Sequence, residues 1–300
     1  MYPVTYMPEE TFTMTQPTVA PFKTQLIKWV GNKQRFAPQI ISLFPEDMKT
    51  YYEPFLGSGG VLGTLSPKRA VASDALHPLM DIWFTLKEDP DQLIQWYAAR
   101  RDGLKDHNQV KARYAYVLAN FNQNPSGADF VFLTRTCYGG VVRFRKSDGG
   151  MSTPCGAHMP ISSDSFAKRV SIWHKRVQGT NFFCTDYKET IELAQPGDVI
   201  YCDPPYTDSQ AILYGAQKFQ FAELLDSIDK AKSRGVYVAL SIDGSKKSGL
   251  HEVLLDFPEG LFETEASITV GRSMLHRFQM NGQSLEGDVV KDRLLLTYNL

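Results

Sequence analysis

The stretch Tyr51-Tyr52-Glu53-Pro54-Phe55-Leu56-Gly57-Ser58-Gly59-Gly60 joins a short, aromatic, strand-prone run to a loop rich in glycine. Glycine lets the backbone turn sharply and leaves room for a ligand to lie against it. The loop is not a phosphate-binding P-loop, and Leu62 stands where the dinucleotide pattern G-x-G-x-x-G needs its third glycine. The stretch therefore predicts a strand followed by a ligand-binding turn. A simpler interpretation is a tight strand-to-helix turn that binds nothing.

Asp74 closes the next predicted strand, Arg69 to Asp74, 17 residues after Gly57. In α/β folds with a ligand at the first turn, an acidic residue at this place accepts hydrogen bonds from ribose hydroxyls. Asp74 is therefore a candidate ligand-binding residue, although a surface aspartate would fit the same pattern.

A second candidate loop, Asp203-Pro204-Pro205-Tyr206, directly follows the apolar run Val199-Ile200-Tyr201-Cys202. Two prolines fix the backbone and remove two N–H donors, so the loop is stiff and rich in acceptors. It suits a planar group that bears N–H donors, with the tyrosine ring stacking on it. The alternative is a plain Pro-Pro turn. Open α/β sheets bind ligands at the carboxyl ends of their strands, where both loops fall.

Three segments of different character follow one another along the chain. Residues 1–21 lack periodicity and predict a flexible arm. Residues 22–83 and 172–300 alternate strand and helix patterns, which predicts an α/β domain with a parallel sheet. Between them, residues 84–171 predict a helical insert that ends in a β-hairpin over 138–156, with its turn at Ser147-Asp148-Gly149-Gly150.

Composition excludes several classes of protein. The 300 residues are 43% hydrophobic and carry a formal net charge of −1, so the chain does not coat nucleic acid by bulk charge, although a local basic groove is compatible with that value. The four cysteines form no Cys-x-x-Cys pair and the histidines show no metal spacing, so we expect no metal. No apolar run approaches the ~18 residues that span a bilayer, and no secretory signal is recognisable. We expect a cytoplasmic protein without membrane contact.

Together the motifs resemble the S-adenosylmethionine-dependent amino-methyltransferases, specifically the Dam-like DNA adenine-N6 methyltransferase family (D12 class, alpha-group). The resemblance covers most of the chain from Lys28 onward. It rests on Lys28-Trp29-Val30-Gly31-Asn32-Lys33, Glu53-Pro54-Phe55-Leu56-Gly57-Ser58-Gly59 and Tyr201-Cys202-Asp203-Pro204-Pro205-Tyr206, in the family's order. It implies a Rossmann-like methyltransferase sheet, with the insert serving as the target-recognition domain.

The resemblance also implies S-adenosylmethionine as the cofactor and assigns residues to it. Trp29 and Lys33 would contact the cofactor, with Lys33 near its methionine carboxylate, although core packing and a solvated lysine are the alternatives. The other cofactor-binding candidates are Phe55, Gly57 and Gly59 in the loop, Asp74 at the ribose, Asp186 beside the adenine, and Asp203.

The catalytic candidates are Asp203, Pro204 and Tyr206. The N6 amine of adenine is a poor nucleophile because its lone pair is delocalised into the ring. If Asp203 and the Pro204 carbonyl accept both N6 protons, the lone pair can point at the methyl group, and alignment supplies much of the rate. Tyr206 would stack on a base flipped out of the duplex.

The segment from Phe130 to Ser147 has four basic residues and no acidic one. In an extended strand, residues 143 and 145 share a face, and a hairpin with paired arginines fits a major groove. We therefore predict DNA contacts from Arg135, Tyr138, Arg143, Arg145 and Lys146. The alternative is a solvated edge strand. The family's usual Asn-Gly-Leu after the aromatic is missing, which leaves the recognised sequence open.

The function predicted from these motifs is site-specific methylation of adenine N6 in double-stranded DNA, and a cognate restriction endonuclease is a candidate partner. Three alternatives stay open at this point: an N4-cytosine methyltransferase, an enzyme acting on RNA, and a non-catalytic DNA-binding module with a vestigial cofactor pocket. A nicotinamide dehydrogenase is disfavoured, because Leu62 breaks its glycine pattern.

Overall fold

The computed structural model describes residues 5–6, 21–205, 219–242, 257–271 and 290–300. The candidate Tyr206 and most of the predicted arm lie outside these ranges. Within the arm, Thr5–Tyr6 form a short strand that pairs with another strand of the sheet, so these two residues correct the prediction of a wholly flexible arm. No helix in the described part of the chain has the length and apolar character needed to cross a membrane.

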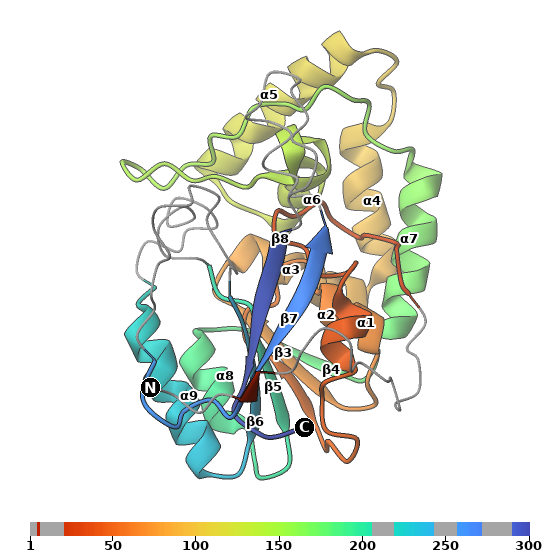
Figure 1. Ribbon diagram of the computed structural model, residues 1–300. Coiled ribbons are helices and arrows are strands. Elements are labelled where there is room, and N and C mark those ends of the chain that lie inside the picture. The colour runs from red at the N-terminus through yellow and green to blue at the C-terminus, as the bar shows by residue number, and fades with distance from the viewer. Residues whose placement is uncertain (1–4, 7–20, 206–218, 243–256, 272–289) are drawn as a thin grey trace.

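A single mixed sheet forms the centre of the described structure (Figure 1). Its strands, in the spatial order β1-β7-β8-β6-β5-β2-β3-β4, are Thr5–Tyr6, Thr264–Gly271, Val290–Leu296, Tyr237–Ile242, Val199–Cys202, Tyr51–Glu53, Ala70–Asp74 and Thr180–Cys184. Strands β2 to β6 run parallel, whereas β8 runs antiparallel to both β6 and β7. Tyr51 lies opposite Ala70 on one side and Val199 on the other. These pairings confirm the predicted α/β class.

Helices cover both faces of the sheet. Side chains alternate between the two faces along each strand, so the apolar strands present buried side chains on both faces. Tyr51 and Tyr201 belong to one apolar core, whereas their neighbours Tyr52, Ile200 and Cys202 belong to the other. The second core is closed by α8 (Tyr187–Leu193) and α9 (Phe221–Ser233), and the first includes residues of α1 (Ala37–Ile41), α2 (Gly60–Leu65) and α3 (His77–Glu88).

The segment between β3 and β4 contains the predicted helical insert: α4 (Pro90–Arg101), α5 (His107–Gln123), α6 (Gly127–Thr136) and α7 (Ser163–Arg176). Figure 1 shows α4, α5 and α6 beyond the edge at which the parallel strands end. The boundaries predicted at 83/84 and 171/172 fall inside α3 and α7. Trp83 and Trp173 pack ring to ring at 5.5 Å within a core that continues to Phe130, so the insert shares the core of the sheet.

Candidate active site

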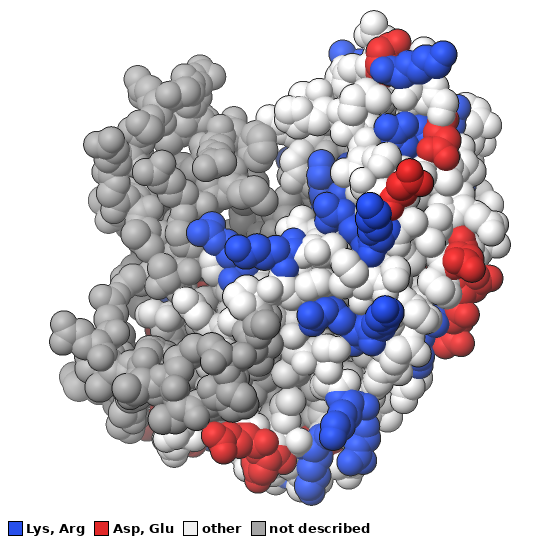
Figure 2. All heavy atoms as spheres, turned by 90° about the vertical axis from the view of Figure 1, so that its right-hand side faces the viewer, with Lys and Arg blue, Asp and Glu red and all other residues white. Residues whose placement is uncertain are grey.

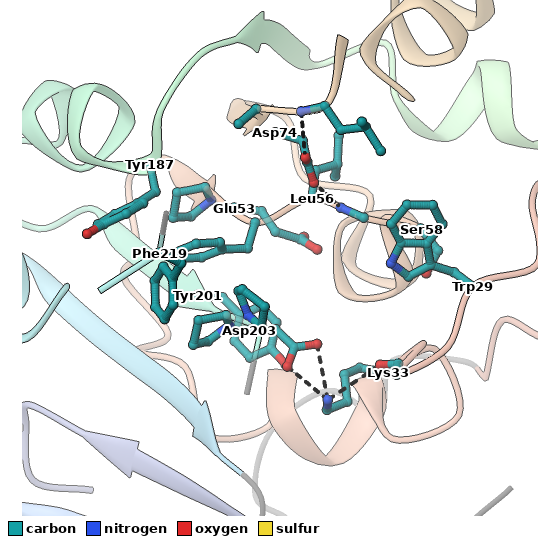
Figure 3. Close-up of a pocket in the computed structure, with 18 of the residues that line it drawn as sticks. Trp29, Lys33, Glu53, Leu56, Ser58, Asp74, Tyr187, Tyr201, Asp203 and Phe219 are labelled. Atoms are coloured by element: carbon teal, nitrogen blue, oxygen red, sulfur yellow. Dashed lines mark hydrogen bonds and ion pairs between the residues drawn. The ribbon is translucent and has the colours of Figure 1, made fainter. Parts of the chain in front are cut away.

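A cavity of about 420 Å³ opens where the strand order reverses, between the ends of β2 and β5 (Figure 3). The chain runs from β2 outward to β3 and β4, then returns to place β5 on the other side of β2. Such a switch point leaves a crevice outside the carboxyl ends of the strands. Loops after β2, β3 and β5 and the start of α8 line the cavity.

The glycine loop after β2 forms one wall. Gly57 lines the cavity with a φ of +47°, and a Cβ there would lie 2.9 Å from Trp29 Nε1. Trp29 also lines the cavity, with its ring edge-on to Phe130 of α6 at 6.3 Å. Gly59 has a φ of +61° and lies against the Trp83 ring. Gly59 therefore helps to turn the loop, as predicted, but it is not among the residues lining the cavity.

Asp74 is tied to the glycine loop by its carboxylate. Its two oxygens accept hydrogen bonds from the amides of Gly57 and Leu76, each at 3.0 Å. Burial raises the pKa of Asp74, although these backbone hydrogen bonds oppose the shift. A carboxylate has about four acceptor positions, so it can still accept hydrogen bonds from ligand hydroxyls. The residue therefore lies where the sequence predicted it.

Lys33, which was predicted to contact the cofactor, lines the cavity and forms an ion pair that the sequence did not predict. Its ammonium lies 2.8 and 3.1 Å from the two carboxylate oxygens of Asp203 (Figure 3). It also lies 3.8 Å from the carboxylate of Asp292. Only 7% of Lys33 is exposed. Burial by itself would lower the pKa of Lys33, but the charge of Asp203, followed by Tyr201 and Asp292, raises it overall. Lys33 is therefore an ammonium at neutral pH and the counter-ion of Asp203.

Glu53 is a cavity residue to which the sequence analysis assigned no role, although it stands in the quoted motif. It is 3% exposed, and its Oε2 accepts hydrogen bonds from Tyr51 OH at 2.7 Å and Leu62 N at 2.9 Å. Burial raises the pKa of Glu53 to about 8; these two hydrogen bonds oppose the shift, and Asp203 adds to it. An acid that ends a buried strand directly before the glycine loop was the signal that could have identified it.

Aromatic rings form the opposite wall of the cavity. Phe55 stacks on Tyr187 with ring centroids 5.0 Å apart, and Phe219 meets both rings at 5.9 and 5.8 Å. Asp186, just before α8, lines the cavity beside them and accepts a hydrogen bond from the Lys188 amide at 2.9 Å. Asp203 and Pro204 lie at the end of β5 on the same cavity. The predicted cofactor and catalytic residues in the described part of the chain are thus brought together, except Gly59.

The predicted DNA-binding residues divide into one that is buried and four that are exposed. Arg135 is 4% exposed and donates hydrogen bonds to the carbonyls of Gln25 and Leu26, at 3.2 and 2.8 Å. Burial lowers its pKa to about 10. The prediction for Arg135 is wrong in this structure, because α6 turns that side chain inward to hold the segment before the Trp29 motif.

Four residues are exposed at the surface of the hairpin region: Tyr138, Arg143, Arg145 and Lys146. Val142 and Phe144, which alternate with Arg143 and Arg145, are buried, whereas both arginines are exposed, as expected if the arginines share a face. Arg145, however, forms two hydrogen bonds of 2.8 Å to the carboxylate of Asp148. Among the described residues, no group of three or more His, Cys, Asp or Glu side chains could hold a metal ion.

Comparison with known proteins gives the family. Residues 29–269 match the family model described as D12 class N6 adenine-specific DNA methyltransferase. The Type II methyltransferase M.MjaIII of Methanocaldococcus jannaschii is 31% identical over 200 residues, which are 60% of this chain and 68% of that protein. A DNA adenine methylase of Vibrio cholerae is 29% identical over 228 residues, or 72% of this chain and 79% of its own.

A solved structure, the rRNA methyltransferase aviRa from Streptomyces viridochromogenes, is 12% identical with a TM-score of 0.32, covering 88% of this chain and 84% of its own. The family match removes the N4-cytosine alternative and the vestigial binding module. The chain belongs to the D12 class of N6-adenine-specific DNA methyltransferases, which transfer the methyl group of S-adenosylmethionine to adenine.

Proposed function

We propose that the cavity between β2 and β5 binds S-adenosylmethionine together with an adenine extruded from double-stranded DNA. The observation that carries this proposal is that Gly57, Asp74 and Asp203 line one cavity, although they lie at the ends of three different strands or in the loops that follow them. A methyl donor and an acceptor amine must meet within bonding distance, so their binding groups have to share one space.

The chemical groups around the cavity fit the cofactor. When bound, S-adenosylmethionine supplies an electrophilic methyl group on a positively charged sulfur. We assign its adenine to the wall formed by Phe55, Asp186 and Tyr187, and its ribose hydroxyls to Asp74. Glu53 is the buried carboxyl placed to face the positive charge of the methionine end. The turn at Gly57 has no space for a side chain beside Trp29, which leaves this wall as bare backbone.

Asp203 and Pro204 are assigned to the target amine. The Asp203 carboxylate is held by Lys33 on one side, and it retains acceptor positions for an N–H of the base. The charged Lys33 fixes the position of the Asp203 carboxylate, whose oxygens can only accept hydrogen bonds from the amine. The Pro204 carbonyl accepts the second N6 proton. The proton that leaves the nitrogen after transfer is already hydrogen-bonded to Asp203, so this carboxylate is its first acceptor.

The insert is assigned to DNA recognition, as the target-recognition domain of the enzyme. Its hairpin exposes Tyr138, with 43% of its surface accessible, beside Arg143 and Lys146. Lys168 and Lys175 are exposed on α7. On the face seen in Figure 2, groups of Lys and Arg side chains run from the top of the molecule to the bottom, and Asp and Glu lie mainly along the right-hand side. Such a distribution attracts the phosphate backbone of DNA despite the net charge of −1.

A base inside a duplex cannot reach Asp203, so we infer that the target adenine is flipped, at a cost of roughly a few kcal/mol. Stacking on Tyr206 would offset about 1–3 kcal/mol of that cost.

A cognate restriction endonuclease also remains a proposal; it is supported by relatives that are named type II methyltransferases. The cytoplasmic location stays a prediction.

The experiment is methylation of an unmethylated duplex DNA of mixed sequence with tritiated S-adenosylmethionine, followed by digestion to nucleosides. We expect the label in N6-methyldeoxyadenosine, within one sequence context, and more strongly in duplex than in single-stranded DNA. Label in N4-methyldeoxycytidine, or transfer to RNA alone, would contradict the proposal.

A further inference from the structure

The hairpin between α6 and α7 is held by two separate groups of cross-strand backbone hydrogen bonds. Near the tip, the amides of Arg145 and Ser152 donate to the carbonyls of Gly150 and Arg143, and at the base the amides of Tyr138 and Gly156 donate to those of Pro154 and Thr136. Two antiparallel pairs define the hairpin, Phe144 opposite Met151 at the tip and Cys137 opposite Cys155 at the base. Between these pairs the first strand has three more residues than the second, because Tyr138–Gly140 form a 3-10 turn. The ladder is therefore interrupted in the middle, next to Arg143. A strand with an interrupted ladder is free to slip in register unless side chains fix it.

The hydroxyl of Thr153 bridges this interruption. It accepts a hydrogen bond from the amide of Arg143 at 3.0 Å and donates one to the carbonyl of Val141 at 2.6 Å. Thr153 is 4% exposed, so water does not compete for these bonds. Both backbone groups of Arg143 are thus bonded to the opposing strand: its amide donates to the Thr153 hydroxyl, and its carbonyl accepts from the Ser152 amide at 2.9 Å.

Helix α5 holds the second strand of the hairpin from outside. The side-chain amide of Asn122 donates to the Met151 carbonyl at 3.0 Å and accepts from the Met151 amide at 2.7 Å. This pair of bonds is what a neighbouring strand would otherwise supply. One more bond, from Tyr114 OH to the Thr153 carbonyl at 2.7 Å, links the same helix to the strand.

We propose that Thr153 and Asn122 are positioning residues for DNA sequence recognition: they fix the strand that carries Arg143 relative to α5. The inference rests on the proposed function of the hairpin. A slip of one residue would exchange the exposed Arg143 for a buried neighbour, and smaller shifts would misalign a guanidinium that has to match two atoms of one base. The two side chains therefore determine how strictly the sequence is read, without touching DNA.

The test compares Thr153→Val, which removes the hydroxyl at nearly constant volume, with Thr153→Ser, which keeps it. Each purified variant methylates unmethylated genomic DNA, and sequencing that detects N6-methyladenine gives the motif. For Thr153→Val we expect an approximately tenfold higher KM for DNA and methylation at sites that differ from the motif by one base. For Thr153→Ser we expect the motif and KM of the unchanged protein. Asn122→Ala provides a second variant whose effect matches that of Thr153→Val.

Measurements of the Kd for S-adenosylmethionine and of the Tm accompany these assays. At temperatures below the Tm of each variant, we expect the Kd for S-adenosylmethionine to equal that of the unchanged protein. It is overturned if Thr153→Val and Asn122→Ala keep the motif and the KM for DNA, or if cofactor and DNA binding weaken together. Arg143→Ala, run in parallel, separates the two proposals. If Arg143→Ala leaves sequence recognition intact, the proposal that the hairpin reads DNA is wrong. If Arg143→Ala relaxes recognition but Thr153→Val and Asn122→Ala do not, only the positioning role of Thr153 and Asn122 is wrong.

Discussion

The cavity at the carboxyl ends of the parallel strands and the hairpin of the insert are built in different ways. The cavity lies at the ends of parallel strands, and its residues are fixed by backbone pairing such as Tyr51 with Ala70 and Val199. The hairpin has two short groups of backbone hydrogen bonds, at its tip and its base, and side-chain hydrogen bonds from Thr153 and Asn122 supplement them. On the proposed function, the chemistry is tied to the topology of the fold, whereas recognition would depend on a few side chains that can change without disturbing the sheet.

The largest effect is expected at the cavity, from Asp203→Asn. The amide offers one acceptor and turns an N–H donor toward an amine that itself donates, so the single-turnover rate of transfer should fall by at least about a hundredfold. The Kd for S-adenosylmethionine should change far less. Asp47→Asn, the same chemical change at an exposed residue, is the control. An Asp203→Asn enzyme that transfers at the original rate would remove Asp203 from the reaction.

The corresponding change in the hairpin is Arg143→Ala. Loss of a base-reading arginine costs about 1–3 kcal/mol, so KM for DNA should rise roughly tenfold to a hundredfold while the cofactor Kd stays constant. Arg145→Ala is a matched control, because that side chain lies on the same face but is bonded to Asp148. Equal effects of the two substitutions in a salt-controlled binding assay would disprove the special role of Arg143.

Glu53 should make cofactor binding depend on pH. Its pKa of about 8 in the free enzyme leaves it mainly protonated at pH 6, and a bound cation favours the ionised form. The affinity for S-adenosylmethionine should therefore increase as the pH rises from 6 to about 8, by at most about tenfold per pH unit, and then level off. Glu53→Gln removes this dependence, and comparison with it subtracts the titration of the cofactor itself. Identical pH profiles for the two proteins would exclude Glu53.

The smallest effect on recognition is expected from Arg135→Leu. Arg135 bonds the carbonyls of Gln25 and Leu26, and Arg169 also donates to that of Gln25. Loss of Arg135 therefore leaves the buried Leu26 carbonyl unpaired and should lower the free energy of unfolding by about 1–3 kcal/mol. Chemical denaturation gives that value, and KM for DNA measured well below the Tm should not change. A rise in KM as large as that of Arg143→Ala would restore Arg135 to the DNA-binding set.

Sequence patterns predicted the positions that follow from strand ends. Gly57, Asp74 and Asp203 each follow or close a β-prone run, and in a parallel sheet all such ends meet at one edge. The pairing of Lys33 with Asp203 was not predictable, because the two residues are 170 positions apart and meet only through the strand order. Arg135 was misassigned because a basic run was taken as one surface, although α6 turns one of its residues inward. The roles of all these residues stay predictions.

The separation of the two regions can be tested most directly by hydrogen–deuterium exchange of the backbone amides, first with S-adenosylmethionine alone and then with duplex DNA added. We predict that the cofactor slows exchange in residues 55–59, 74–76 and 186–188 and leaves exchange in residues 141–153 unchanged until DNA is present. Slowed exchange in 141–153 with the cofactor alone, together with unchanged exchange in the three loops, would contradict it.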